Sequence, residues 1–450
     1  MCMHYLKRKI ISALTASAVL VLLTACTKAK AKAIPETTDT GAQITEETEK
    51  GISDPEPLPE EGESSADAFH IGIVTGSFSQ SEDDRRGAEA FQKKYGADNV
   101  TLVIYPDNFT EEPENTIQTI VNLSEDPLMK AVIVNQAVDG TSEAFRRIHE
   151  KRPDILCIAG EAYEDLADIG ETADLVVNCD FINRGYLIIR SAHELGCDTF
   201  VHISFPRHLS YETVSRRVAV MRAACEEFGI RFEMEEAPDP ITEAGVPGAQ
   251  AYIREHFNEW LQKYGDRSAY FCTNDAHTAP LISKLLTNGG YFIEADLPSP
   301  LLGYPEALGL DLTSAAGDPE KILNTVETAV VEKGGAGRFG TWAYSYGFTA
   351  SAGLAEHARN VISGKSSLTD VDDLSRAYGV FSPGADWNGS RYSDAETGKR
   401  SDNIILIYQD TYILGNPGYY LGSTKIEVPE EYRAVSHTKA EDKETTDEEE

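Results

Sequence analysis

Basic residues are scarce in this chain. Its 450 residues include 40 lysines and arginines against 74 aspartates and glutamates, which gives a formal net charge of −34 at pH 7. Proteins that bind nucleic acid need clustered lysine and arginine to displace counterions from the phosphates. The deficit therefore argues against nucleic-acid binding, and we expect much of the acidic surplus to lie on solvated surfaces.

Common catalytic signatures are also missing. Neither G-x-S-x-G nor H-E-x-x-H occurs. Residues 335–340 spell G-x-G-x-x-G, but they follow a helical pattern, whereas a dinucleotide site needs this motif after a strand. Gly364-Lys365-Ser366 resembles the end of a P-loop, yet Arg359 stands where the first glycine of that motif should be. We therefore predict that the protein is not an enzyme and has no cofactor; an extracytoplasmic enzyme is the less favoured alternative.

Cysteine is rare, and no C-x-x-C pair occurs. Of the seven cysteines, Cys2 and Cys26 lie near the N-terminus, and the other five are an odd number found largely in or beside strand-like runs. This pattern favours buried free thiols over a disulfide framework. His193 and Cys197 share a helix face at i and i+4, but no second ligand pair accompanies them. We predict no metal site.

The first 25 residues have the layout of a secretory signal. Lys7-Arg8-Lys9 precedes an apolar segment, 10–23, that is too short to span a bilayer comfortably. Leu23-Thr24-Ala25-Cys26 resembles the lipobox of bacterial lipoproteins, in which the cysteine carries a diacylglyceryl group. Two acyl chains anchor a protein stably. We therefore expect lipid attachment at Cys26 and an extracytoplasmic location at the cell membrane; an ordinary signal peptide is the alternative.

Two stretches, 26–67 and 433–450, contain few large apolar residues. They cannot bury enough surface to offset the entropy of ordering, so we interpret them as a tether and an acidic tail. The roughly 365 residues between them are more than a single hydrophobic core usually supports. We expect a signal peptide at 1–25, an α/β lobe at 68–180, a second α/β lobe at 181–303, and crossover segments with elements that complete both lobes at 304–432.

Short β-branched runs alternate with amphipathic helical patterns from residue 69 onward. The run 70–76 ends in a glycine turn, after which Ala88, Phe91 and Tyr95 follow at helical spacing. The alternation continues to 175–177 and then restarts with a helix. Strands and helices that alternate in this way predict a parallel sheet covered on both faces. The predicted fold class is α/β, with two Rossmann-like lobes that have parallel sheets and are hinged by crossover segments.

Five motifs follow one another along this core. They are Thr75-Gly76-Ser77-Phe78-Ser79, Asn178-Cys179-Asp180, Phe271-Cys272-Thr273-Asn274-Asp275-Ala276-His277, Leu302-Gly303-Tyr304-Pro305 and Tyr346-Gly347-Phe348. Together they resemble the type I periplasmic binding proteins, the two-lobed receptors of ABC importers. The resemblance implies a strand that ends at the fourth motif. Residues 374–421 are longer than the family's usual ending and have no assigned role, although 404–408 are typical of a strand. No DNA-binding headpiece precedes the core, which disfavours the repressor branch of this family.

The resemblance implies a ligand site in a cleft between the lobes. In open α/β sheets, ligands bind at the carboxyl ends of the strands. That rule selects Ser77, Phe78, Asn135, Gln136 and Glu161 from the first lobe, and Phe205, Arg207, Asn274, Asp275 and Tyr304 from the second. The aromatic rings could stack on a sugar or base, while the polar groups satisfy hydroxyls or amides.

Six of these candidates have an alternative role. Asn274 and Asp275 could cap the helix that follows them. Phe78 and Phe205 could belong to the core, Arg207 could pair with a surface acid, and Glu161 could be an ordinary loop acid.

A solute-binding function is the prediction that follows from the resemblance. The ligand would be a small polar molecule, such as a sugar or nucleoside, that is delivered to an ABC permease. The lipid anchor would hold the protein at the membrane. A lipoprotein that senses the ligand and signals to a membrane partner would have the same fold, and it is the alternative.

Overall fold

The computed structural model describes residues 69–243, 245–394 and 397–433. The predicted signal peptide, Cys26, the tether and residues 434–450 of the tail lie outside the described residues, so these interpretations stay predictions. By their contacts, all of the described residues belong to a single unit. Among the described helices, none has the length and apolar character needed to cross a membrane.

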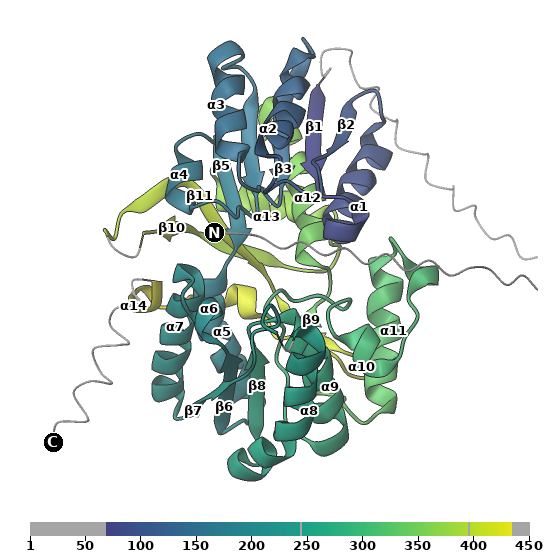
Figure 1. Ribbon diagram of the computed structural model, residues 1–450, viewed down its shortest axis with the longest axis vertical. Helices are drawn as coiled ribbons and strands as arrows, with labels where there is room; N and C mark the ends of the chain where they lie inside the picture. Colours follow the sequence, from purple (N-terminus) through teal and green to yellow (C-terminus); the bar gives the residue numbers. More distant parts are fainter. Residues whose placement is uncertain (1–68, 244, 395–396, 434–450) are drawn as a thin grey trace, which may run out of the picture. The chain divides into compact units, whose positions relative to one another are not determined.

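The first lobe is built on a seven-stranded sheet with the strand order β10-β11-β5-β4-β3-β1-β2 (Figure 1). Neighbouring strands are parallel except β10, which is antiparallel to β11. The elements of this lobe are β1 (His70–Thr75), α1 (Phe78–Tyr95), β2 (Val100–Ile104), α2 (Pro113–Val121), η1 (Asn122–Glu125), β3 (Met129–Asn135), α3 (Thr141–Lys151), β4 (Leu156–Gly160), α4 (Leu166–Gly170), β5 (Leu175–Cys179), α12 (Tyr346–Ile362), α13 (Val371–Gly379), β10 (Trp387–Ser393) and β11 (Arg400–Gln409).

The second lobe contains a parallel sheet, β7-β6-β8, and a smaller antiparallel sheet, β13-β12-β9. Its elements are α5 (Phe181–Glu194), β6 (Thr199–Ser204), α6 (Pro206–Leu209), α7 (Glu212–Phe228), β7 (Arg231–Glu236), α8 (Gly245–Tyr264), β8 (Ser268–Cys272), α9 (Asp275–Asn288), α10 (Tyr304–Leu308), η2 (Thr313–Ala315), α11 (Pro319–Glu332), β9 (Gly340–Trp342), β12 (Thr411–Ile413), β13 (Tyr419–Tyr420), η3 (Ser423–Lys425) and α14 (Glu430–Arg433).

Apolar periodicity explains why these segments fold as they do. Strand β3 is buried along almost its whole length because helices cover both faces of a parallel sheet. Helix α3 instead buries one stripe that includes Ala144, Phe145 and Ile148. The five cysteines of the described chain are buried and free, which confirms the expectation of unpaired thiols. The predicted α/β fold class is likewise confirmed.

The chain passes between the two lobes three times. It crosses from β5 to α5, from β9 to α12, and from β11 to β12. The unassigned region 374–421 therefore has a role in the fold, because β10 and β11 extend the first sheet while β12 and β13 belong to the second lobe. The expected strand at 404–408 is confirmed as part of β11.

One expected strand is wrong. The motif that contains Gly303, Tyr304 and Pro305 does not end a strand; Tyr304 begins the short helix α10. Gly303 takes a positive φ of 74°, which breaks any extended run, and a proline in the first turn is already shaped for a helix.

Candidate cleft between the lobes

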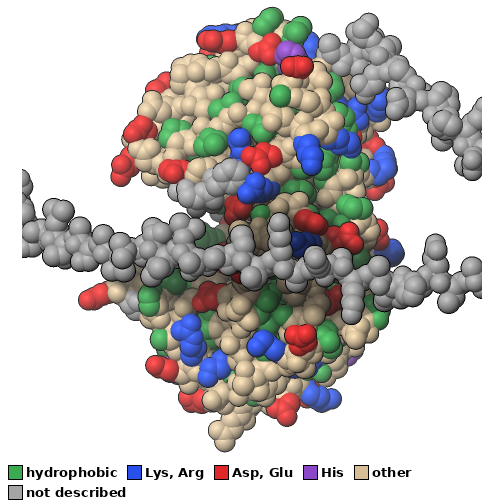
Figure 2. All heavy atoms as spheres, turned by 90° about the vertical axis from the view of Figure 1, so that its right-hand side faces the viewer, with side chains coloured by type: hydrophobic (Ala, Val, Ile, Leu, Met, Phe, Trp, Pro, Cys, Tyr) green, Lys and Arg blue, Asp and Glu red, His purple; other side chains and the backbone are tan. Residues whose placement is uncertain are grey.

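A cavity of about 500 Å³ lies between the lobes, where β3, β4 and β8 end. Its lining comes from the start of α1, the turns after β3 and β4, the first residue of α9, residues 297–302 and the start of α12. Two further cavities, of about 440 and 1030 Å³, share residues with it on either side. Figure 2 shows the surface hollowed between the lobes, with both acidic and basic side chains in view there. The three cavities therefore form one cleft.

Helix α1 places two neighbouring acids in the cleft. Ser81 interrupts the helix with non-helical angles (φ −154°, ψ 68°), so the regular turns begin with Glu82, Asp83 and Asp84. Acids are favoured in a first turn because the helix N-terminus carries partial positive charge. The buried Asp84 carboxylate accepts hydrogen bonds from the Ser81 hydroxyl and, at 3.2 Å, from Gln136 Nε2.

Gln136 and Glu161 occupy matching places after β3 and β4. Their φ angles are 50° and 45°, and they alone among the described non-glycine residues have positive φ. Such a conformation costs on the order of 1–3 kcal/mol and persists where the surroundings hold it in place. The Glu161 carboxylate accepts a hydrogen bond of 3.0 Å from the backbone N–H of Cys179. Both side chains line the cavity.

Helix α9 supplies an acid from the second lobe. The Asn274 side chain caps this helix, because its Oδ1 accepts a hydrogen bond of 3.0 Å from the Ala276 N–H. Asp275 then stands at the first helical position, where it lines the cavity and meets the water in the cleft. The capping alternative thus applies to Asn274, whereas Asp275 lines the same cavity as the acids of the first lobe.

Burial raises the pKa values of the cleft acids. The pKa of Asp84 rises to about 6, mainly through burial and further through the charge of Asp83. The pKa of Glu161 rises to about 7, again mainly through burial. The pKa of Asp275, whose side chain is exposed in the cleft, rises to about 6, mainly through partial desolvation by the surrounding protein and further through the charge of Asp296. Strongly shifted acids gathered in a cleft are typical of a functional site.

The structure brings three of the ten predicted site residues to this cavity, namely Gln136, Glu161 and Asp275. Arg207 lines the adjoining 1030 Å³ cavity, where its guanidinium binds both carboxylate oxygens of Asp239 at 2.7 and 2.9 Å. Arg207 therefore pairs with an acid, which is the alternative role that we considered for it from the sequence.

The other predicted residues lie elsewhere. Asn135 is buried and donates to the Ser351 hydroxyl at 2.7 Å. Phe205 is buried and packs 4.2 Å from the ring of His208, measured between centroids. Tyr304 is buried in the second lobe and donates to the Gly340 carbonyl at 2.7 Å, so it does not face the cleft. Ser77 precedes α1 without capping it, and the side chain of Phe78 lies outside the described residues.

Sequence reasoning missed several cleft residues, among them Asp83, Asp84, Tyr163 and Tyr346. Tyr346 begins α12 directly after the second crossing, and its hydroxyl donates to the Val177 carbonyl at 3.3 Å. The one sequence signal for part of this set is the pair of adjacent acids, Asp83 and Asp84, near the start of the first helix.

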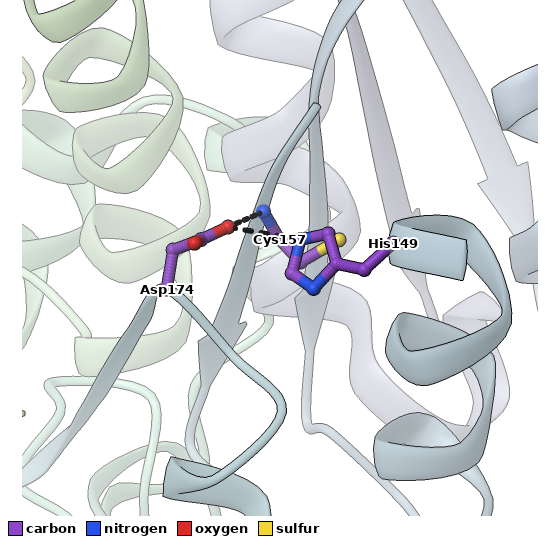
Figure 3. Close-up of side chains that lie close together, drawn as sticks. All are labelled: His149, Cys157 and Asp174. Atoms are coloured by element: carbon purple, nitrogen blue, oxygen red, sulfur yellow. Dashed lines mark hydrogen bonds and ion pairs between the residues drawn. The ribbon is translucent and has the colours of Figure 1, made fainter. Parts of the chain in front are cut away.

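A second group of ligand-type side chains, His149, Cys157 and Asp174, lies in the first lobe. It is the one set of three in the described chain whose ligand atoms all come within 4.8 Å of one another. Figure 3 shows the Asp174 carboxylate directed at the backbone of Cys157, to which it is bonded at 2.7 Å, and at the His149 imidazole. His149 Nε2 also lies 3.2 Å from the Ile155 carbonyl. Since a carbonyl only accepts, Nε2 carries a hydrogen, and the group is a set of hydrogen bonds at the start of β4.

Two α/β lobes joined by three crossings, with a polar cavity at the carboxyl ends of their strands, define the type I periplasmic binding protein fold. The chain belongs to the family described as a protein of unknown function (DUF3798), whose profile matches residues 69–340. A second family profile matches residues 351–435.

The chain is also similar to several known proteins and solved structures. Two proteins of Treponema pallidum (strain Nichols), both titled uncharacterized protein, are 42% and 39% identical over 46% and 41% of this chain and over 94% and 85% of their own lengths. A putative transcriptional regulator from Clostridium difficile 630 has a TM-score of 0.70 with 20% identity, over 77% of this chain and 99% of its own. A sugar ABC transporter protein from Actinomyces odontolyticus ATCC 17982 has a TM-score of 0.49 with 9% identity, over 81% and 99%. At 20% identity, the likeness to the regulator shows the fold alone.

Proposed function

We propose that this protein is a lipid-anchored, extracytoplasmic solute-binding protein that captures a small polar ligand between its lobes and delivers it to an ABC-type importer. The observation that carries the proposal is the cavity at the carboxyl ends of β3, β4 and β8. It receives Gln136 and Glu161 from one lobe and Asp275 from the other. A ligand there contacts both lobes at once.

Contacts to both lobes would couple binding to a change between lobe arrangements. A ligand shifts such an equilibrium only by as much as it binds one arrangement better than the other. Three chain crossings are the segments about which the lobes would move, and hinged closure around a ligand is a known means of signalling to a partner. The lipid anchor would keep the protein within reach of the permease.

Native mass spectrometry of the full chain tests the proposal by detecting any small molecule that purifies with it. Leu297→Trp should reduce occupancy, because Leu297 is partly exposed and lines both the 500 and the 1030 Å³ cavities, so the larger ring fills the cleft. Leu128→Trp is the matched control, since Leu128 is an exposed leucine in a turn before β3.

Equal occupancy in both variants would place the ligand outside the cleft and contradict the proposal. Where no molecule purifies with the protein, thermal-shift measurements with sugars, nucleosides and amino acids supply the ligand. The stabilisation by whichever compound binds should then be lost in Leu297→Trp and retained in Leu128→Trp.

A further inference from the structure

Carboxyl groups dominate the charge of the 500 Å³ cavity. In the described part of the chain, no lysine, arginine or histidine lines it. Asp83 and Asp84 enter from α1, Glu161 from the turn after β4, and Asp275 from α9. Glu82 lines the cavity too, but it pairs with Arg86 one helical turn away. Four acids thus approach the same space from both lobes.

Two of these four acids have neutral hydrogen-bond partners. Asp84 accepts hydrogen bonds from Ser81 and Gln136, and Glu161 accepts one from the backbone N–H of Cys179. No described basic side chain forms an ion pair with any of the four. Basic groups line the two neighbouring cavities instead: Arg207, which binds Asp239, and His208 line the 1030 Å³ cavity, and Arg86, which pairs with Glu82 and Glu89, lines the 440 Å³ cavity.

Helix ends do not balance this charge. Helices α1, α9 and α12 each begin at the cavity. One helix N-terminus carries roughly half an elementary positive charge, so three of them offset at most about one and a half of the four negative charges. A surplus of negative charge therefore remains once the acids are ionised.

The carboxylates that line the cavity are too far from one another for a bare metal ion to be the ligand that fits best. Among the described residues, only the distant group at His149 brings three ligand-type side chains within 4.8 Å of one another. The cleft acids instead surround a space of about 500 Å³, which is the size of a site for a small organic molecule.

One tyrosine adds a feature that suits an organic cation. Tyr163 is 59% exposed at the cavity, so its ring face is free to contact a cationic group.

We infer that the ligand of this cleft is an organic cation, a compound with one or more ammonium or guanidinium groups that Asp84, Glu161 and Asp275 bind. This inference rests on the proposed solute-binding function and deepens it by assigning the ligand class. It departs from the sugar or nucleoside that the family resemblance implies. A neutral sugar would leave the buried Asp84 carboxylate and the half-buried Glu161 carboxylate without a counter-charge, which is costly in a site of this kind.

Thermal-shift and calorimetric titrations of the full chain test the inference at pH 7.5. The cationic probes are putrescine, spermidine, agmatine and choline; the neutral probes are D-arabinose and D-ribose; calcium and manganese chlorides test for a metal ion. At least one amine or guanidine should stabilise the protein. Glu161→Gln and Asp84→Asn should weaken its binding by about 10- to 100-fold, the effect of losing one charged hydrogen bond.

Exposed acids provide matched controls. Glu125→Gln and Asp98→Asn remove the same charges from surface positions of the first lobe and should leave binding unchanged. Stabilisation by a neutral sugar that Leu297→Trp abolishes, without a response to any cationic probe, would overturn the inference and leave the proposed function standing. Binding of the metal ions but of none of the organic cations would also overturn it. A protein that responds to no probe would count against both.

Discussion

Arg184 and Glu294 form an ion pair that is almost completely buried where the three crossings meet the second lobe. Arg184 Nε lies 2.8 Å from Glu294 Oε1, and the two side chains are 2% and 1% exposed. Glu294 Oε2 accepts hydrogen bonds from Trp342 Nε1 at 3.1 Å and from the Thr411 hydroxyl at 3.2 Å. The Glu294 carboxylate thus bonds to side chains from α5, β9 and β12, and each of these elements adjoins a different crossing.

Glu294→Ala should destabilise the protein strongly. It leaves the Arg184 guanidinium buried without its counter-charge and removes the acceptor that joins the three segments. Breaking a buried pair by removing one partner typically costs about 3–5 kcal/mol of unfolding free energy, which urea unfolding measures.

An exposed glutamate provides the control for that substitution. Glu150 pairs with Arg146 on the surface of α3 and is 61% exposed, so Glu150→Ala should change the unfolding free energy by less than about 1 kcal/mol. Similar losses in the two variants would show that the buried network does not hold the crossings together.

The fold could be predicted from the sequence because parallel strands leave a direct signal. The run 131–134 is apolar and β-branched, and its buried place in β3 follows from that composition. Gln136 and Glu161 could be placed at the cleft by their position after a strand alone. The sequence could not show that Tyr304 turns inward, because the positive φ of Gly303 and the helix α10 depend on tertiary packing.

The acidic character of the cleft was harder to foresee. Asp83 and Asp84 reach the cavity because α1 is interrupted at Ser81, and a helical pattern gives no sign of that break. Tyr346 comes to the same place through the second crossing, about 200 residues after β4. Conformations set by long-range packing of this kind do not appear in local sequence patterns.

Glu161→Gln should stabilise the protein in the absence of ligand, by an amount that grows with pH. Folding raises the pKa of Glu161 from 4.5 to about 7, so the folded state binds this proton more tightly than the unfolded state. The ionised carboxylate therefore costs stability, and the cost grows as the pH rises from 4.5 to 7 and is fully present above 7.

The variant should accordingly match the wild type near pH 4, and its melting temperature should exceed that of the wild type increasingly up to about pH 7.5. The groups that face Glu161 contribute to the size of the difference: Asp84 on α1, Tyr163 beyond β4, Cys179 on β5, Asp296 in the second lobe, Tyr346 on α12 and Tyr378 on α13. A constant difference across this range would mean that Glu161 titrates normally.

Cys26→Ser should release the protein from membranes. Without the thiol no diacylglyceryl group can be attached, and the strongly acidic chain has little attraction for anionic lipid. Fractionation of cells that express the full chain, followed by immunoblotting, measures the release. Cys2→Ser is the matched control and should stay with the membrane fraction, because that cysteine precedes the expected cleavage site. Retention of the Cys26 variant would place the anchor elsewhere.

The thiol of Cys157 should resist alkylation in the folded protein, and the group it forms with His149 and Asp174 should retain no zinc. Burial raises the pKa of Cys157 far above its usual range, which keeps the sulfur protonated, and a thiolate is both the nucleophile and the metal ligand. Peptide mass spectrometry after iodoacetamide treatment at pH 8 should find Cys157 unmodified unless the protein is first unfolded. Native-state alkylation, or zinc that purifies with the wild type and is lost in His149→Ala, would instead make this group a metal or reactive-thiol site.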